Sequence, residues 1–293
     1  MKLHKQTIIN KAAKILARPL SILVGNPFTE KVARAFEAYW CALLGKGAGT
    51  GWAMDAEISA ARWAIRNQQP VLFDVGANCG EWSTRMQKEF GLAQIFMFEP
   101  QPACQEIICG KNLPRSILIP FAASDFAGKS LQLFTSCEDS GIASIHQRRD
   151  SYFSEHQFTS IEVSTVTIDQ IIEQHGLSQV DFVKIDVEGH ELAVLHGAEK
   201  SLKKGVIKAL SFEFGSGNLN SRTFFHDFWD LLTPLNYRIF RILPASQLLP
   251  IDEYYEDCEY FRGVTNYIAV LDAGFVTPEF CFPRPGAKLK KQL

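Results

Sequence analysis

The sequence predicts an α/β protein built on a mostly parallel sheet with helices on both faces. Short apolar runs and amphipathic helical segments alternate from Pro70 onward, which is the order that a doubly wound sheet produces. The first apolar run, 71–73, leads into Asp74 and a turn that contains Gly76 and Gly80. A buried strand that ends in a glycine turn before a helix is typical of a site for a nucleotide-like ligand.

Helical segments precede the sheet. We expect a basic amphipathic helix within residues 1–24 that stops before Pro19. A stronger pattern covers 29–44, where apolar residues recur at spacings of three and four and Thr29 is the expected N-cap. A further helix is expected at 55–66. The chain is therefore divided into a helical extension (1–66), a sheet domain (67–275) and a C-terminal tail (276–293).

Within the sheet domain, strands and helices follow one another at short intervals. Thr167 begins one helix, because Gln170 three residues later completes a capping box. Further helices are expected at 191–202 and 221–232. The expected strands are 71–75, 94–99, 117–122, a hairpin of 130–135 with 161–166, and then 180–186, 206–214, 237–243 and 267–271.

Composition limits the class of protein. The 293 residues are 46% hydrophobic and carry a net charge of −2, so the chain lacks the basic signature of nucleic-acid binding. Seven cysteines without a C-x-x-C pair predict reduced thiols in a cytoplasmic protein. The apolar stretch 15–24 is interrupted by Arg18 and Pro19 and makes a poor secretory signal.

Basic residues are concentrated at the N-terminus. Five cations precede the first acidic residue, Glu30, and such a segment can contact an anionic membrane or a glycan. A solvated helix face is the alternative interpretation, and nothing in the sequence sets an oligomeric state. The five cations are Lys2, Lys5, Lys11, Lys14 and Arg18.

Polar residues follow the strands in register, where ligands of such sheets bind. Glycines allow close backbone approach, and a helix start offers free N–H groups. Glu99, about twenty residues past the glycine turn, can accept both ribose hydroxyls. Ser124 and Asp125 can hydrogen-bond an adenine amino group. The residues after the strands are Asp74, Gly76, Asn78, Gly80, Glu99, Ser124, Asp125, Asp186, Glu188, His190 and Glu213.

Four segments resemble, in order and wording, the FkbM family of S-adenosylmethionine-dependent methyltransferases: D-V-G-A-N-C-G (74–80), F-E-P (98–100), A-A-S-D (122–125) and K-I-D-V-E-G-H-E (184–191). The resemblance spans roughly residues 70–271, and K-I-D-V-E-G is its most specific motif. It implies a Rossmann-like class I methyltransferase fold with seven strands, the last antiparallel. It also implies O-methylation of a hydroxyl on a sugar, glycan or natural-product acceptor, with S-adenosyl-L-methionine as cofactor.

The same resemblance implies roles for individual residues. Gly76, Asn78 and Gly80 would surround the methionine part of the cofactor, and Glu99 would hold its ribose. Ser124 and Asp125 would contact the adenine. Asp74 and Asp186, which end neighbouring strands, complete the cofactor-binding set.

Methylation of an alcohol also requires a base that takes the hydroxyl proton. Asp186 ends the strand that neighbours the first strand, so it should lie closest to the methyl group. Glu188 and His190 follow it and should border the same ligand site. His190 has a suitable intrinsic pKa. Alternatively, Glu188 belongs to a strand-to-helix turn and His190 is a helix N-terminal residue without a partner. No metal site is predicted, because Val194 stands where a zincin motif has its second histidine.

The long region 136–160 is the expected acceptor-recognition element, a polar and mobile loop. Its Arg148 and Arg149 can meet an anionic or hydroxyl-rich acceptor, or can be ordinary solvated charges. The sequence does not identify the acceptor.

Two other functions stay open. An NAD-dependent oxidoreductase is disfavoured, because Asn78 takes the place of the middle glycine in G-x-G-x-x-G and no tyrosine has a lysine four residues later. A non-catalytic binding module on the same fold is the second alternative.

Overall fold

The structure is a computed structural model that describes residues 11–24, 26–47, 53–136, 140–149, 155 and 157–272. By its internal contacts the chain divides into two compact units, Met1–Leu44 and Gly45–Leu293. The expected tail at 276–293 lies outside the described residues. The described helices include none that is long and apolar enough to cross a membrane.

The first unit is helical. Residues 11–17 are helical and end before Pro19, η1 (Ser21–Val24) is a short 3₁₀ turn, and α2 covers Pro27–Leu43. The prediction of Thr29 as N-cap of α2 is wrong. Asn26 holds that position, because its Oδ1 accepts the N–H groups of Phe28 and Thr29 at 3.1 Å each.

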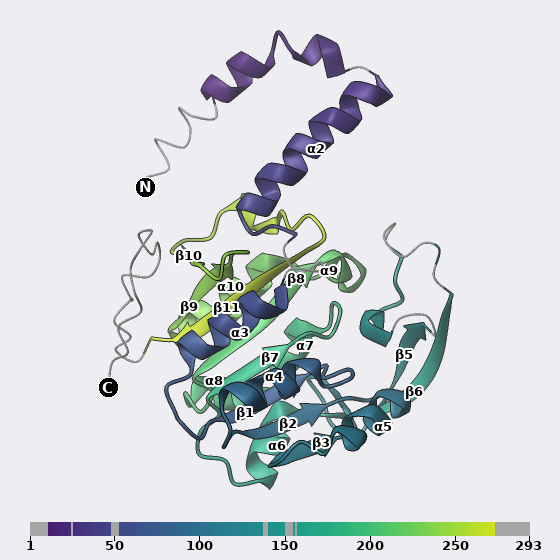
Figure 1. Cartoon of the computed structure of the whole chain (residues 1–293), viewed down its shortest axis with the longest axis vertical. Coiled ribbons are helices and arrows are strands. Elements are labelled where there is room, and N and C mark those ends of the chain that lie inside the picture. The colour runs from purple at the N-terminus through teal and green to yellow at the C-terminus, as the bar shows by residue number, and fades with distance from the viewer. Residues whose placement is uncertain are drawn as a thin grey trace. The chain divides into compact units, whose positions relative to one another are not determined.

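An eight-stranded sheet forms the centre of the second unit (Figure 1). Its order is β10-β9-β11-β8-β7-β1-β2-β3, so the strand order reverses between β1 and β7. β1, β2, β3, β7 and β8 run parallel, whereas β11 and β9 pair antiparallel with their neighbours. The bounds are β1 Val71–Val75, β2 Gln94–Phe98, β3 Ser116–Ile119, β7 Phe182–Ile185, β8 Ala209–Gly215, β9 Tyr237–Ile242, β10 Leu248–Ile251 and β11 Val264–Leu271.

The mostly parallel sheet with an antiparallel last strand is confirmed, but the expected number of seven strands is wrong. The additional strand is β10, which pairs antiparallel with β9 at the edge of the sheet. Pro250 lies inside β10. Proline cannot donate to a ladder and is tolerated on edge strands, which explains why the apolar pattern gave no strand there.

The predicted hairpin is confirmed as a separate small sheet. β5 (Ser130–Ser136) pairs antiparallel with β6 (Phe158–Val166), and β4 (Ala122–Ala123) pairs parallel with β6. The side chain of Thr167 accepts the N–H of Gln170, as expected of a helix N-cap.

Helices cover both faces of the large sheet, as predicted. Side chains of α3, α4 and α5 form one core cluster with Leu72, and those of α6, α7, α8 and α10 form another with Phe73. Alternate residues of a strand point to opposite faces, so β1 contributes to both clusters. The bounds are α3 Ala53–Ala64, α4 Glu81–Glu89, α5 Pro102–Lys111, α6 Ile168–Gln174, α7 Glu191–His196, α8 Glu199–Lys203, α9 Ser216–Ser221 and α10 Phe225–Leu232; the 3₁₀ turns are η2 Ser140–Ile142, η4 Thr233–Leu235 and η5 Glu256–Glu259.

The structural boundary between the units differs from the sequence boundary after residue 66. Helix α3 belongs to the second unit, because its small residues Ala60, Ala61 and Ala64 are buried against the sheet. The expected helix at 191–202 is also divided, into α7 and α8. At the division a Cβ on Gly197 would lie 2.0 Å from the carbonyl oxygen of Ser124, so the chain is tightly packed there.

Candidate functional site

A cavity of about 820 Å³ lies beyond the carboxyl ends of the central strands. Residues at the carboxyl ends of β1, β2, β7 and β8 form its walls. Segments far apart in the sequence therefore meet at this edge of the sheet, as expected for the ligand site of such a fold. The sequence-predicted residues that line it are Gly76, Asn78, Glu99, Asp186, Glu188, His190 and Glu213.

The turn after β1 needs glycine for a reason internal to the fold. Gly76 has a φ of +78°, and the N–H groups of Gly76 and Ala77 both bond to the carbonyl oxygen of Phe98. A Cβ on Gly76 would lie 1.8 Å from the carbonyl oxygen of Asp186. The close approach here is that of two backbones, from the turn after β1 and the end of β7. Gly80 has a φ of +74°, is the N-cap of α4 and does not line the cavity.

Asn78 and Glu99 join the first two strand ends. The N–H of Asn78 donates to Oε2 of Glu99 at 2.7 Å, and the N–H of Gln101 donates to Oε1 at 2.8 Å. Burial raises the pKa of Glu99, and these two hydrogen bonds oppose that effect. The side chain of Gln101 also bonds to Glu99, and the carboxylate has lone-pair capacity for a further hydrogen bond at the cavity wall.

Asp74 lies behind the cavity wall and does not line it. Its Oδ2 accepts the hydroxyl proton of Ser83 at 2.6 Å, and its side chain is fully buried. Nζ of Lys184 lies 3.6 Å from Oδ1 of Asp74 and 3.0 Å from Oδ2 of Asp186. Burial alone would lower the pKa of Lys184, but the carboxylates of Asp186, Asp74 and Glu57 together raise it. Lys184 is therefore a buried cation between the ends of β1 and β7.

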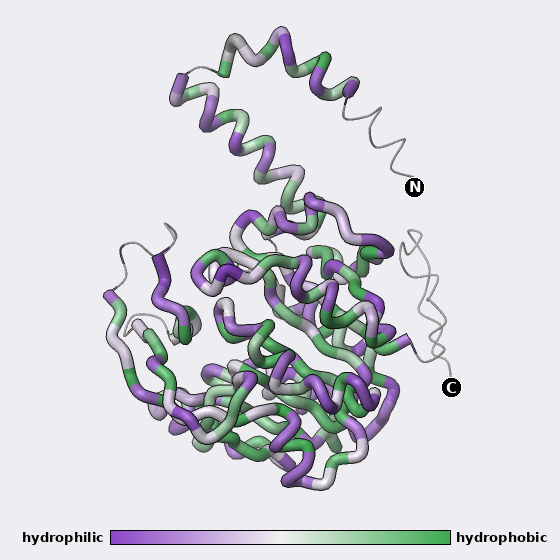
Figure 2. The backbone as a smooth tube through the Cα atoms, turned by 180° about the vertical axis from the view of Figure 1, so that it is seen from behind, coloured by the Kyte–Doolittle hydropathy of each residue, from purple (hydrophilic) through white to green (hydrophobic). Residues whose placement is uncertain are grey.

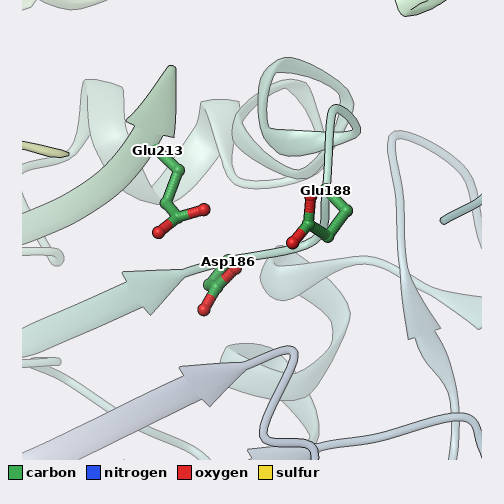
Figure 3. A group of neighbouring side chains, drawn as sticks. All are labelled: Asp186, Glu188 and Glu213. Carbon is green, nitrogen blue, oxygen red and sulfur yellow. The ribbon is translucent and has the colours of Figure 1, made fainter. Parts of the chain in front are cut away.

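Three carboxylates converge on the opposite side of the cavity (Figure 3). Asp186, Glu188 and Glu213 each offer an oxygen, and these oxygens all lie within 4.8 Å of one another. Burial raises the pKa of Glu213 well above its usual value, and the neighbouring carboxylates of Asp186 and Glu188 raise it further.

Carboxylate oxygens at such separations can also ligate a divalent cation. Two of these carboxylates already have protein cations, since Asp186 pairs with Lys184 and Glu188 pairs with Arg148. The donor set therefore does not require a metal for charge balance, and the expectation of no metal site stays a prediction.

The loop before β6 is fixed over the turn that follows β7. Nη1 of Arg148 lies 2.5 Å from Oε2 of Glu188, and Nη2 donates to Oγ of Ser216 at 3.2 Å. The hydroxyl of Ser144 donates to the carbonyl oxygen of Glu188 at 2.7 Å. The described residues 140–149 are thus anchored, and Arg148 is a buried, paired cation at the cavity wall and not a solvated charge.

His190 lies within a chain of hydrogen bonds. Its Nε2 lies 3.0 Å from Oγ of Ser124, whose hydroxyl donates to Oδ1 of Asp125, and its Nδ1 lies 3.3 Å from Nε2 of His146. Burial, and then the neighbouring His146, lower the pKa of His190 to about 4. If the Ser124 proton points to Asp125, Nε2 of His190 must donate and Nδ1 must accept, so both ring nitrogens are occupied. The alternative that His190 has no partner is therefore wrong.

The remaining predicted residues, Ser124 and Asp125, do not line the cavity. Their side chains are turned toward His190 and each other, as described above. The neighbouring cavity wall is apolar and consists of Phe121, Ala122 and Ala123.

Sequence reasoning missed Glu57, a residue of α3 that interacts electrostatically with Lys184, Asp186 and Asp74. Glu57, on α3, accepts a hydrogen bond from Nδ2 of Asn266 on β11, and burial raises its pKa to about 7. Asn266 lies opposite Glu213 in the ladder of β11 and β8. A signal was present, because Glu57 interrupts an otherwise small and apolar face of α3.

A second hollow of about 390 Å³ adjoins the first, since Ile145 lines both. Arg149 and Arg222 contribute to its wall together with His146, which contacts His190 as described. The pair of histidines therefore lies between the two hollows, with His190 at the wall of the first and His146 at the wall of the second.

Comparison with known proteins identifies the family. The model of the Methyltransferase FkbM domain matches residues 74–239, which is more than half of the chain. This match confirms the resemblance that the four sequence segments indicated.

Named relatives are methyltransferases. The chain is 30% identical to the 2-O-methyltransferase NoeI of Sinorhizobium fredii over 48% of this chain and 62% of that protein. It is 28% identical to the hexuronic acid methyltransferase AglP of Haloferax volcanii over 46% of this chain and 53% of that protein. The chain is 23% identical to the methyltransferase sdnD of Sordaria araneosa over 45% of this chain and 61% of that protein. The matches thus span less than two thirds of each relative.

Proposed function

The chain belongs to the FkbM methyltransferase family, and we propose that it transfers a methyl group from S-adenosyl-L-methionine to a hydroxyl oxygen of a sugar, glycan or natural product. The names of NoeI and AglP, a 2-O-methyltransferase and a hexuronic acid methyltransferase, support this acceptor class. The observation that carries the proposal is the two-sided cavity, with Asn78 and Glu99 on one wall and Asp186 and Glu213 on the other.

The first wall fits the cofactor. Glu99 is held by two backbone N–H groups and lines the cavity, where its carboxylate can accept a hydrogen bond from the ribose hydroxyls. The apolar wall of Phe121, Ala122 and Ala123 suits the flat adenine ring, whereas Ser124 and Asp125 do not line the cavity. The cofactor, when bound, supplies a methyl group on a positively charged sulfur.

The second wall receives the proton of the acceptor hydroxyl. Asp186 is the proton acceptor, and Glu213, whose pKa burial raises strongly, lies beside it in the same group of carboxylates. Nζ of Lys184 lies 3.0 Å from Oδ2 of Asp186 and holds this carboxylate in place. Positioning of the hydroxyl oxygen supplies much of the remaining rate enhancement.

Glu188 and His190 support the site without taking the proton. Glu188 anchors the loop 140–149 through Arg148, and His190 has hydrogen-bond partners on both ring nitrogens. The hollow beside His146 adjoins the cavity at Ile145, and Arg149 and Arg222 line it. Two guanidinium groups there suit an acceptor that carries hydroxyl or anionic groups.

Calorimetry of the full chain with S-adenosylmethionine, S-adenosylhomocysteine and NAD tests the proposal. Binding of both methionine-derived ligands, followed by transfer of a labelled methyl group to a hydroxylated acceptor, is the expected result. Binding of NAD alone would favour the oxidoreductase, and no binding of any of the three would favour a non-catalytic module.

A further inference from the structure

Helix α2 carries an apolar face that is exposed along its whole length. Residues three and four apart lie on one side of a helix, and this spacing places six large apolar side chains together. The exposed fraction is 75% at Phe28, 63% at Phe36 and 60% at Trp40. The α2 apolar face consists of Phe28, Val32, Phe36, Tyr39, Trp40 and Leu43.

The other side of α2 is charged. Glu30 pairs with Arg34 at 2.7 Å, and Lys31 and Glu37 are also exposed. Figure 2 shows hydrophilic and hydrophobic residues alternating along this helix. A contiguous apolar patch bordered by charged residues marks an interaction surface, because its exposure to water is unfavourable.

Cations are concentrated directly before this helix. Lys11, Lys14 and Arg18 are exposed, and the sequence has no acidic residue before Glu30. The same segment exposes apolar side chains, among them Leu16 at 72%. The whole chain has a net charge of −2, so the positive charge is local to this segment.

We propose that residues 11–44 bind the surface of a membrane that contains anionic lipids. The cations meet the headgroups, and α2 lies along the interface with its apolar face at the acyl boundary. Tyr39 and Trp40 contact each other edge to face, with their ring centroids 5.4 Å apart. Tyrosine and tryptophan are the residue types that favour the headgroup level of a membrane. The four charged residues on the opposite side of α2 keep the helix on the surface.

A second copy of the chain fits this surface less well. Residues 11–44 contain five cations and two carboxylates, so two copies joined through this segment would bring together two stretches of net positive charge. Like charges brought together oppose association, whereas anionic headgroups neutralise the same cations.

Flotation of the full chain with lipid vesicles tests the proposal. We expect binding to vesicles that contain about 30% phosphatidylserine, weaker binding to phosphatidylcholine alone, and release at about 0.5 M salt. The variant F36D/W40D should bind anionic vesicles at least about tenfold more weakly. The variant K11E/K14E should lose the preference for anionic lipid.

The matched control is Leu92→Asp, which changes an apolar residue that is 51% exposed in the second unit. This control should bind vesicles as the unmodified chain does, and calorimetry with S-adenosylhomocysteine reports whether the second unit of each variant is intact. Absence of vesicle binding by the unmodified chain would overturn the proposal. So would dimers in lipid-free light scattering that F36D/W40D abolishes, because the face would then serve self-association.

Discussion

Arg148 and Glu188 form a buried ion pair between positions 40 residues apart, with Nη1 of the guanidinium 2.5 Å from Oε2 of the carboxylate. The pair connects the loop before β6 to the turn after β7, at the wall of the cavity. A carboxylate that the sequence assigns to catalysis is thereby used to hold the loop that borders the acceptor space.

Loss of this ion pair should destabilise the protein. Arg148→Ala leaves Glu188 without its cation in a site where the arginine side chain is only 1% exposed. We expect a loss of about 3 kcal/mol in the free energy of unfolding, measured by urea denaturation. Arg149→Ala removes an exposed neighbour and should change stability by less than about 0.5 kcal/mol. Equal effects of the two variants would contradict the structural role of Arg148.

Gly76 should tolerate no side chain. Gly76→Ala places a Cβ 1.8 Å from the carbonyl oxygen of Asp186, so we expect failure to fold. Gly128→Ala is the control, because Gly128 has a similar φ of +72° and no atom within 4 Å of its added Cβ. It should cost only about 1–2 kcal/mol, the usual cost of a left-handed conformation for alanine. Circular dichroism and thermal melts measure both, and a folded Gly76→Ala protein would show that the two strand ends can separate.

Glu99 should decide cofactor affinity. Glu99→Gln has a single carbonyl oxygen for the N–H groups of Asn78 and Gln101, so one of these loses its acceptor. We expect S-adenosylhomocysteine to bind about 10- to 100-fold more weakly by calorimetry, the equivalent of one hydrogen bond to a charged group. Asp125→Asn, a change outside the cavity wall, should leave the affinity nearly unchanged. The opposite ranking would restore Asp125 to the adenine site.

Asp186 should matter more to the chemical step than His190 does. We expect Asp186→Asn to lower kcat by about 100-fold or more, because the proton acceptor is removed. His190→Gln should lower kcat by less than about tenfold, since the pKa of His190 is lowered to about 4 and both its ring nitrogens have partners. Steady-state kinetics in which kcat and KM are separated measures both variants, and a larger loss from His190→Gln would identify the histidine as the base.

Glu57 should make stability depend on pH. Burial raises the pKa of Glu57 to about 7 in the folded state, whereas the unfolded state has the usual value of 4.5. The folded state therefore binds more protons between these values, and stability should fall as pH rises from 4.5 to 7. Glu57→Gln should remove this part of the slope and stabilise the protein at pH 8, by at most about 3 kcal/mol. Urea denaturation at several pH values gives the slope, and an unchanged slope would contradict the assignment.

Local patterns in the sequence were sufficient for the order of the elements and for the edge of the sheet that holds the site. Apolar periodicity gave the strand–helix alternation, and Thr167 was recognised as an N-cap because capping is a contact between near neighbours. The edge strand β10 was missed, because Pro250 obscures its pattern.

The partners of the site residues were decided by the tertiary structure. The contacts of Glu188 with Arg148, of His190 with His146 and of Asn266 with Glu57 join residues 40, 44 and 209 positions apart. Side-chain identity alone does not fix such contacts, because charge and pKa depend on which groups the folded chain buries together. The sequence by itself therefore determined which residues follow the strands, and only the folded chain decided which of them face the cavity and which hold its walls.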